Sequence, residues 1–380
     1  MALDLLVIQP TPFCNINCDY CYLPARDDRR RMSLETLEAA FRRVFESGLA
    51  GSELSVVWHA GEPLVLPLEW YADAFAVIDG VRPDGAHVRH SMQTNATLID
   101  RRWCAFFADH AINIGLSIDG PAWLHDRYRK TRAGQGTHAR AMRGLYALHA
   151  ACLPFHVICV LTRESLAHPD AIFDFFADLG VRDLCFNVEE IEAANVRSSL
   201  AFAGVEAVFR SFFERMVERV RTAPGGMRVR EIDDVLAALR HSDFGRFTSN
   251  SQNTPFQIVS IAWDGRIGTF SPELLGWCHQ RYGAFTFGDV ATHTLTDVAV
   301  DERFQSIAAD IAAGVEACRR TCPYFAFCRG GAPANKLAEN GTFTSTETLY
   351  CRLTQKIVIE CVLTALERDL ATRQALSAFA

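Results

Sequence analysis

Cys14-Asn-Ile-Asn-Cys18-Asp-Tyr-Cys21 places three thiols within a short stretch near the start of a 380-residue chain. The apolar run from Leu3 to Gln9 precedes it and ends at a proline, as a buried strand would. A loop after a strand can wrap three thiolates around one [4Fe–4S] cubane, which normally takes four cysteine ligands. Three ligands leave one iron open to a small molecule. The segment therefore predicts a cluster with an open coordination position.

Zinc and chance clustering are the alternatives for these three thiols. Zinc would need a fourth Cys or His nearby, and His59 is the nearest histidine along the chain. The chain has 13 cysteines, so the expected number of chance matches to this spacing is only about 0.015. The spacing therefore favours an iron–sulfur cluster.

Composition restricts the class of protein. Hydrophobic residues make up 49% and charged residues 22% of the chain, as in a globular enzyme. The N-terminus has no basic segment and no cleavage site, and no apolar run reaches the roughly 20 residues that span a bilayer. We therefore expect a cytoplasmic protein without a membrane partner, and the net charge of −7 argues against nucleic acid. Bunched cysteines in a reducing compartment indicate metal before disulfides.

The first half of the chain alternates between strand and helix patterns. A helix is predicted from about Leu34 to Glu46 with Ser33 as its N-cap, and Thr97 with Asp100 resembles a capping pair at a later helix start. Strands are predicted at 54–58, 112–118, 155–161 and 184–188, and a further strand ends at 91–94. A helix is predicted at 205–221. Repeated βα units predict an α/β fold with a parallel sheet, either barrel-like or doubly wound.

The pattern changes near Gly225. Short strands with turns follow, then a cysteine-rich loop and a long helix from about Thr348 to Ala371. We therefore predict a core barrel over 1–225, a bridging helical segment over 226–247 and a smaller cysteine-rich domain over 248–380.

Several motifs in the first half resemble those of the radical S-adenosylmethionine (SAM) superfamily. That family carries Cys-x3-Cys-x2-aromatic-Cys after the first strand, and Tyr20 fills the aromatic position. The run Trp58-His-Ala-Gly-Glu-Pro63 resembles the family's Gly-Gly-Glu-Pro motif, with Ala60 in place of the first glycine. We expect alanine to fit there if its dihedrals are ordinary. Segments 93–95 and 117–121 resemble the third- and fourth-strand motifs. The fold implied is a partial (β/α) TIM-type barrel.

The resemblance also implies ligands for the cofactors. Cys14, Cys18 and Cys21 would hold a [4Fe–4S] cluster that binds SAM. Gly61 and Glu62 would contact the SAM amino group, and Arg129 its carboxylate. The whole cofactor-binding set implied is Tyr20, His59, Gly61, Glu62, Thr94, Asn95, Ser117, Asp119 and Arg129. His59 is about as well explained as a hydrogen-bonded structural histidine.

A second group of cysteines lies near the C-terminus, at Cys318, Cys322, Cys328 and Cys351. It resembles the SPASM domain of radical SAM peptide-modifying enzymes, with one extra residue in the first spacing. The resemblance implies one auxiliary [4Fe–4S] cluster with four thiolate ligands. A four-cysteine site suits zinc equally well by ligand count.

The family's second auxiliary cluster is not expected here. Its cysteine positions correspond to Phe270, to Ala332 and to a position near Pro255, and only Cys278 is close. In the sulfatase-maturing branch a catalytic Asp follows the first of these cysteines. Ser271 stands at that position and argues against sulfatase maturation. The sequence assigns no catalytic residue.

The segments 8–14, 58–63 and 271–276 look like those of the cyclophane-forming maturases that act on glycine-rich repeat precursor peptides. This implies a 5′-deoxyadenosyl radical, hydrogen abstraction from a ribosomally synthesised precursor peptide, and a bond from an aromatic ring to a Cβ. It also implies an electron donor such as flavodoxin or ferredoxin. Epimerisation with Cys278 as hydrogen donor, thioether formation, and a non-catalytic zinc-containing peptide-binding scaffold are the alternatives.

Overall fold

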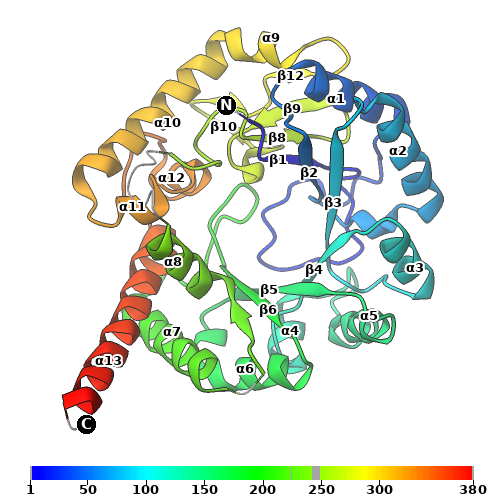
Figure 1. Ribbon diagram of the computed structural model, residues 1–380. Helices are drawn as coiled ribbons and strands as arrows, with labels where there is room; N and C mark the ends of the chain where they lie inside the picture. The colour runs from blue at the N-terminus through cyan, green and yellow to red at the C-terminus, as the bar shows by residue number, and fades with distance from the viewer. Residues whose placement is uncertain (1, 224, 242–248, 379–380) are drawn as a thin grey trace.

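The computed structural model describes residues 2–223, 225–241 and 249–378. Within these residues one large sheet has the strand order β12-β9-β8-β1-β2-β3-β4-β5-β6-β7. Six consecutive strands form its centre and are mutually parallel: β1 (Leu5–Ile8), β2 (Glu53–Trp58), β3 (His87–Thr94), β4 (Asn113–Ser117), β5 (Phe155–Leu161) and β6 (Asp183–Val188). Figure 1 shows that this sheet curves around a central space, which confirms the predicted α/β partial barrel.

Helices follow the strands and cover the outside of the curved sheet (Figure 1). They are α1 (Leu34–Glu46), η1 (Pro63–Val65), α2 (Leu68–Val81), α3 (Arg101–Asp109), α4 (Ala122–Tyr128), α5 (His138–Ala150), η2 (Ser165–Ala167), α6 (Pro169–Asp178), α7 (Val205–Thr222) and α8 (Arg230–Arg240). Trp58 of β2 is fully buried against Tyr71 of α2, with ring centroids 5.3 Å apart in an edge-on arrangement. Such aromatic contacts bury large apolar areas between sheet and helices.

The two edges of the sheet are formed by short strands. β7 (Arg228–Val229) pairs with β6, whereas β8 (Ile258–Ile261) pairs in parallel with β1. β9 (Arg266–Thr269) and β12 (Gly288–Asp289) continue that edge with antiparallel pairing. The chain after residue 248 therefore extends the same sheet. The three-part domain division stays a prediction, and residues 242–247 of its bridging segment lie outside the described residues.

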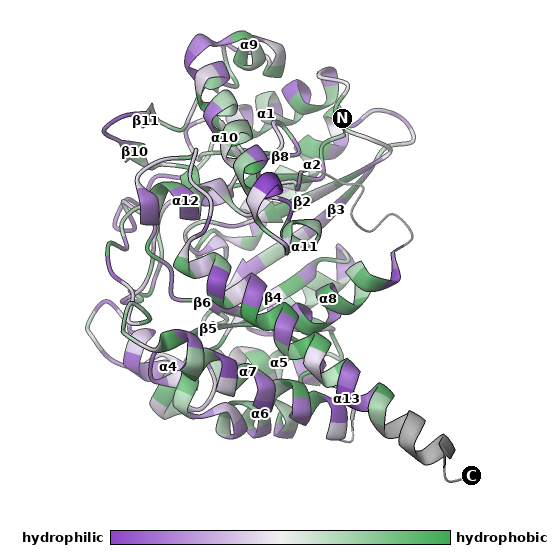
Figure 2. Ribbon diagram, turned by 90° about the vertical axis from the view of Figure 1, so that its left-hand side faces the viewer, coloured by the Kyte–Doolittle hydropathy of each residue, from purple (hydrophilic) through white to green (hydrophobic). Residues whose placement is uncertain are grey.

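The C-terminal part is mostly helical. It contains η3 (Pro272–Leu274), a two-stranded ribbon of β10 (Cys278–His279) and β11 (Gly283–Ala284), and then α9 (Leu295–Val300), α10 (Glu302–Thr321), α11 (Phe325–Cys328), α12 (Pro333–Asn340), the π-helix η4 (Cys351–Ile357) and α13 (Val358–Ala378). Figure 2 shows α13 running away from the body of the molecule. The predicted long helix thus begins with a π-helical segment at Cys351, a type of distortion that is frequent at functional sites.

Ser33 caps α1 as predicted, since its hydroxyl accepts from the amide of Thr36. The capping pair of Thr97 with Asp100 is wrong. Asp100 is itself the N-cap of α3, and its Oδ1 accepts from the amide of Trp103 at 2.9 Å. The hydroxyl of Thr97 instead accepts from Asn15 Nδ2 at 2.9 Å. Thr97 therefore holds the loop of residues 14–21, which we call the cysteine loop. Among the described residues, no helix has the length and apolar composition to span a bilayer.

Candidate active site

The predicted cofactor-binding residues lie at the carboxyl ends of the parallel strands. Because these ends meet at one edge of the sheet, loops that are distant in sequence come together there. A cavity of about 370 Å³ opens among them. Its lining includes Cys14, Cys18, Tyr20, Cys21, His59, Gly61, Glu62, Thr94, Asn95, Ser117 and Arg129. Of the predicted set, only Asp119 does not line this cavity.

The cysteine loop is tied to the neighbouring loops by backbone contacts. Asn17 N donates to Lys130 O at 2.7 Å, and the guanidinium of Arg132 donates to the carbonyl of Cys14 at 2.7 Å. Burial, helped by the charge of Glu62, raises the pKa of Cys14 to about 12, and burial likewise raises that of Cys18 to about 12. Such thiols ionise only when a cation balances the thiolate. Cys21 lines the same cavity, so three sulfurs are placed together for iron ligation.

The turn after β2 lies directly against the cysteine loop. The amide of Glu62 donates to Phe13 O at 2.9 Å. Gly61 has φ +100°, and a Cβ at this position would lie 2.3 Å from Thr11 O. Ala60 has φ +67°, so the condition of ordinary dihedrals is not met at this alanine. The close approach of two backbones forces this turn into the left-handed region, where alanine is strained.

Glu62 is a buried carboxylate that joins β2 to β3. Its Oε1 accepts from Thr94 Oγ1 at 2.6 Å and its Oε2 from Asn95 N at 2.8 Å. Burial nevertheless raises its pKa to about 7. Asn95 Nδ2 in turn lies 3.8 Å from Cys14 Sγ. Glu62 therefore holds the third-strand loop in place beside the cysteine loop.

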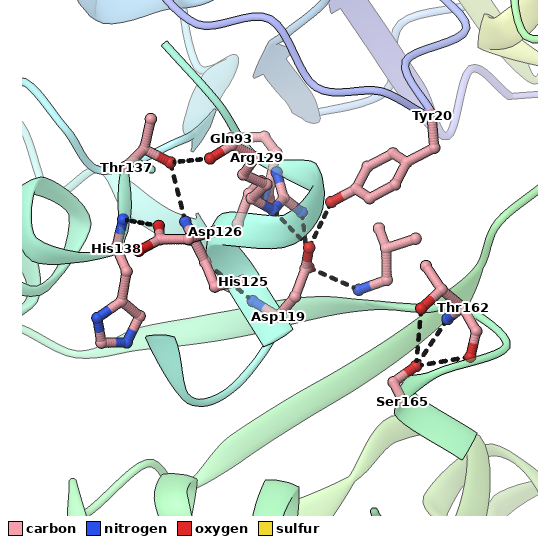
Figure 3. A network of polar contacts seen from close by, with 12 residues as sticks. Tyr20, Gln93, Asp119, His125, Asp126, Arg129, Thr137, His138, Thr162 and Ser165 are labelled. Atoms are coloured by element: carbon pink, nitrogen blue, oxygen red, sulfur yellow. Dashed lines mark hydrogen bonds and ion pairs between the residues drawn. The ribbon is translucent and has the colours of Figure 1, made fainter. Parts of the chain in front are cut away.

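A buried ion pair connects the fourth-strand motif to the aromatic residue of the cysteine motif (Figure 3). Arg129 donates through Nε and Nη2 to the two oxygens of Asp119, both at 2.9 Å. Tyr20 OH donates to Asp119 Oδ2 at 2.5 Å. Burial alone would raise the pKa of Asp119, but the Arg129 charge and these hydrogen bonds hold it below its ordinary value. Asp119 itself does not line the cavity, but its hydrogen bonds position Tyr20 and Arg129, which do.

His59 lines the cavity beside Tyr22. Its Nε2 lies 3.2 Å from Tyr22 OH, and its buried Nδ1 has no hydrogen-bond partner among the described residues. Burial lowers the pKa of His59 to about 4, so the ring is neutral near pH 7. The free Nδ1 is available to a bound ligand.

The C-terminal cysteines surround a second, smaller cavity of about 100 Å³. Cys318, Cys322, Cys328 and Cys351 all line it, together with Lys336. Burial raises the pKa of Cys351 to about 12 and that of Cys328 in the same direction. Among the described residues, no three His, Cys, Asp or Glu side chains are placed to hold a single metal ion. The four sulfurs face a shared cavity instead.

The residues at the positions where the family's second auxiliary cluster would have its cysteines have other surroundings here. Phe270 is 1% exposed and stacks on Phe304, with centroids 5.8 Å apart. Ala332 lines a cavity of about 440 Å³ between the two cysteine groups. Cys278 lies exposed on β10 and outside the lining of these three cavities. Apolar packing therefore replaces a thiolate at Phe270.

Three glutamates outside the predicted set of site residues line both the 370 Å³ and the 440 Å³ cavity: Glu190, Glu192 and Glu273. Asn335 Nδ2 donates to Glu190 at 2.5 Å and to Glu192 at 3.1 Å. Burial, with the charge of Glu273, raises the pKa of Glu190 to about 7, and burial with the charge of Glu190 raises that of Glu192. For Glu190 and Glu192 the available signal was their position just after β6, because functional side chains follow strand ends in such sheets. Glu273 lies in η3 and carried no such signal.

We predict that Gly61→Ala prevents assembly of the N-terminal site. The new Cβ would overlap the carbonyl of Thr11, so the cysteine loop must move. Anaerobic reconstitution should then load about four fewer iron atoms per chain. Gly48→Ala is the matched control, since Gly48 has φ +69° with no atom within 4 Å of its Cβ position, and it should lose only about 1 kcal/mol of stability. Full iron loading in Gly61→Ala would contradict the prediction.

We predict that Asp119→Asn lowers the free energy of unfolding by about 3–5 kcal/mol at neutral pH, because it leaves the buried Arg129 charge unbalanced. The folded pKa of Asp119 lies below its unfolded value of about 3.9, so the contribution is complete above that pH and is lost only as the pH falls through the folded pKa.

Anaerobic chemical denaturation between about pH 5 and pH 8 measures this effect. The difference between wild type and Asp119→Asn should stay constant over that range. Asp126→Asn, a neighbouring carboxylate outside the ion pair, should cost less. A difference that shrinks within this range would contradict the assignment.

Comparison with known proteins agrees with this geometry. Residues 8–176 match the model of the radical SAM superfamily. An uncharacterized protein of Synechocystis sp. is 44% identical over 371 residues, which cover 97% of this chain and 93% of that protein. The serine-type anaerobic sulfatase-maturating enzyme of Klebsiella aerogenes is 38% identical over 188 residues, or 49% of this chain. The match spans 46% of that enzyme, about half of its length.

Solved structures resemble the fold over nearly the whole chain. The structure of anSMEcpe with bound AdoMet has a TM-score of 0.78 at 21% identity and covers 97% of this chain and 98% of its own. Streptococcus suis SuiB bound to precursor peptide SuiA has a TM-score of 0.63 at 16% identity and covers 92% of this chain and 76% of its own. Together with the family match, the cysteine loop and the curved parallel sheet lead to one conclusion. The chain belongs to the radical SAM superfamily, whose members use a [4Fe–4S] cluster with S-adenosylmethionine, and it is a radical SAM enzyme.

Proposed function

We propose that this enzyme modifies a ribosomally synthesised precursor peptide. One observation carries the proposal: the cavity lined by Cys14, Cys18 and Cys21 shares four lining residues with a larger cavity of about 440 Å³. The shared residues are Asn187, Glu190, Glu192 and Glu273. A substrate in the larger cavity would therefore lie next to the cofactor site, and the volume suits a few peptide side chains.

The comparisons support a peptide rather than a small metabolite. One solved neighbour is SuiB bound to its precursor peptide, and another is anSMEcpe bound to AdoMet and the Kp18Cys peptide. The sulfatase-maturating relatives also act on proteins, as their name states. Peptides and proteins are therefore the substrate class that these neighbours share.

The residues at the first cavity fit the cofactors of the family. Cys14, Cys18 and Cys21 would ligate three irons, and no fourth cysteine among the described residues lines this cavity. Arg129 and the free Nδ1 of His59 offer polar contacts to SAM. When bound, the cluster and SAM supply a 5′-deoxyadenosyl radical that removes one hydrogen atom from the substrate. The protein's part is to orient the peptide and exclude water.

For the reaction itself we propose a bond between an aromatic ring carbon and a peptide Cβ. Such a crosslink removes two hydrogens: one leaves as an atom from Cβ, and the ring loses the other as a proton together with an electron. The electron needs a one-electron acceptor, and an iron–sulfur cluster at Cys318, Cys322, Cys328 and Cys351 would provide it. The proton needs a base near the substrate.

Glu190 and Glu192 supply that base in our proposal. The two carboxyl groups are hydrogen-bonded to each other and share the amide of Asn335. A raised pKa near 7 lets a carboxylate accept a proton at neutral pH and release it again. Ser271, which replaces the catalytic Asp of the sulfatase-maturing branch, is 2% exposed and donates to Gln252 at 3.3 Å. A serine hydroxyl at this position cannot take the role of a carboxylate base.

The test is co-expression with a candidate precursor peptide that contains aromatic residues. We expect a loss of two hydrogens per site, and tandem mass spectra without backbone fragments between the linked residues. Oxidation of a serine to an aldehyde also removes two hydrogens, so a hydroxylamine probe must leave the product unlabelled. An aldehyde, or an unchanged mass, would refute the crosslink. Cys14→Ala should abolish modification, whereas Cys152→Ala, at an exposed cysteine, should not.

We predict that Glu190→Gln uncouples radical formation from crosslinking. The substituted amide can still be held by its neighbours but cannot accept a proton, so crosslinked product should fall about 100-fold or more. Release of 5′-deoxyadenosine in the presence of peptide should persist.

Liquid chromatography of both products from one reaction measures this ratio. Glu206→Gln, on the surface beside Arg352, should keep the wild-type ratio. Equal loss of deoxyadenosine and crosslink in Glu190→Gln would assign the residue to cofactor or peptide binding instead.

A further inference from the structure

Lys336 is a buried cation at the C-terminal cysteines. It lies on α12, its residue is 4% exposed, and it lines the cavity of about 100 Å³ with the four thiols. Its Nζ donates to Gly314 O at 2.9 Å and to Cys318 Sγ at 3.4 Å. In the part of the chain that the structure describes, no ion pair joins Lys336 to a carboxylate. The contacting group that could become negatively charged is therefore the sulfur of Cys318.

A buried ammonium without a counter-charge is costly, so the fold must supply a negative partner. A neutral thiol does not supply one. A [4Fe–4S]²⁺ core with four thiolates carries a net charge of about −2, and one more negative charge after reduction. The positive charge of Lys336 is therefore balanced only when the four cysteines hold an anionic metal–thiolate group.

We propose that Lys336 raises the reduction potential of the auxiliary cluster and so makes it the acceptor of the electron released by crosslinking. The inference rests on the proposed auxiliary cluster and assigns to Lys336 a positioning role in electron transfer. Hydrogen bonds to ligand sulfurs and nearby charge are among the factors that set cluster potentials. A fixed positive charge favours the reduced, more negative state over the oxidised one. Removal of the charge should therefore make reduction harder.

The position of Lys336 is held firmly. A Cβ on Gly314 would lie 2.0 Å from Phe343 O, so α10 and the segment after α12 are already in close backbone contact. The Nζ bond to Gly314 O fixes the ammonium at the end of this contact. A purely structural role, in which Lys336 only joins α12 to α10, is the alternative. It would change stability but not the potential.

Lys356 provides an internal control. It lines the same cavity, but its ammonium pairs with Glu347 and its side chain is 25% exposed. Its charge is therefore already balanced and partly screened by water. The same substitution at Lys356 should move the potential less.

The experiment uses the full-length chain with Cys14, Cys18 and Cys21 replaced by alanine, so that only the auxiliary cluster remains. After anaerobic reconstitution, electron paramagnetic resonance follows a potentiometric titration of wild-type Lys336, Lys336→Met, Lys336→Arg and Lys356→Met. We expect equal iron content, a clearly more negative midpoint potential for Lys336→Met, a smaller shift for Lys356→Met, and a near wild-type value for Lys336→Arg.

An iron-loaded Lys336→Met protein with an unchanged potential would overturn the inference, even if its thermal stability fell. A Lys356→Met shift as large as that of Lys336→Met would overturn it as well. If Lys336→Met fails to hold iron, Lys336→Gln keeps a donor without the charge and is judged by the same criterion. A C-terminal site that binds only zinc would also end it. Failure of peptide crosslinking alone, with both clusters loaded, would refute the proposed reaction and the role of the cluster as its electron acceptor. The effect of Lys336 on the reduction potential of the cluster would still stand.

Discussion

The close contact between the turn at 59–62 and the backbone of residues 11–13 determines how the cysteine loop is placed. Gly61 lies so near to Thr11 O that no side chain fits, and the amide of Glu62 donates to Phe13 O. The turn follows β2 and the cysteine loop follows β1, and these two strands pair in parallel. The sheet therefore fixes the thiols relative to the ends of its other strands. Strain at Ala60, with φ +67°, is a cost of this contact.

One buried charge pair in this structure is balanced, whereas other buried ionisable groups lack an opposite charge among the residues that the structure places. The groups of the second kind line the proposed substrate and auxiliary-cluster cavities. Arg129 is paired with Asp119 through two hydrogen bonds, which leaves the pair available to orient Tyr20. Glu190 and Glu192 lie together and share the Asn335 amide, and within the described ranges no cation is in hydrogen-bond contact with them, so burial raises their pKa. Lys336 has the opposite imbalance beside Cys318. The proposed proton acceptor lines the 440 Å³ cavity, and the proposed electron acceptor lies at the smaller cavity, which shares Ala332 and Asn335 with it.

Much of the fold follows from sequence pattern, because strand and helix periodicity is local. The strand at 155–161 and the helix starting after Ser33 have the bounds that their residues predict. The motifs at Cys14 and at 58–63 also locate the first cavity, because parallel strands bring their carboxyl ends together. Thr97 was misassigned since a Thr-x-x-Asp pattern does not say which of its two residues caps the helix. Glu190 and Glu192 follow a predicted strand, but the strand pattern does not show that they are buried together beside Asn335. Lys336 could not be predicted, because its significance comes from burial and from a partner, Cys318, that is 18 residues away.

The central claim is that three cysteines leave one iron open to SAM. Pulsed electron paramagnetic resonance of the reduced protein, with SAM labelled by ¹⁵N at its amino group, tests it most directly. The account predicts a nitrogen hyperfine coupling that shows SAM bound to the cluster and that disappears in Cys18→Ala while the C-terminal signal remains. A reduced, fully loaded protein that shows no such coupling with saturating SAM would contradict it.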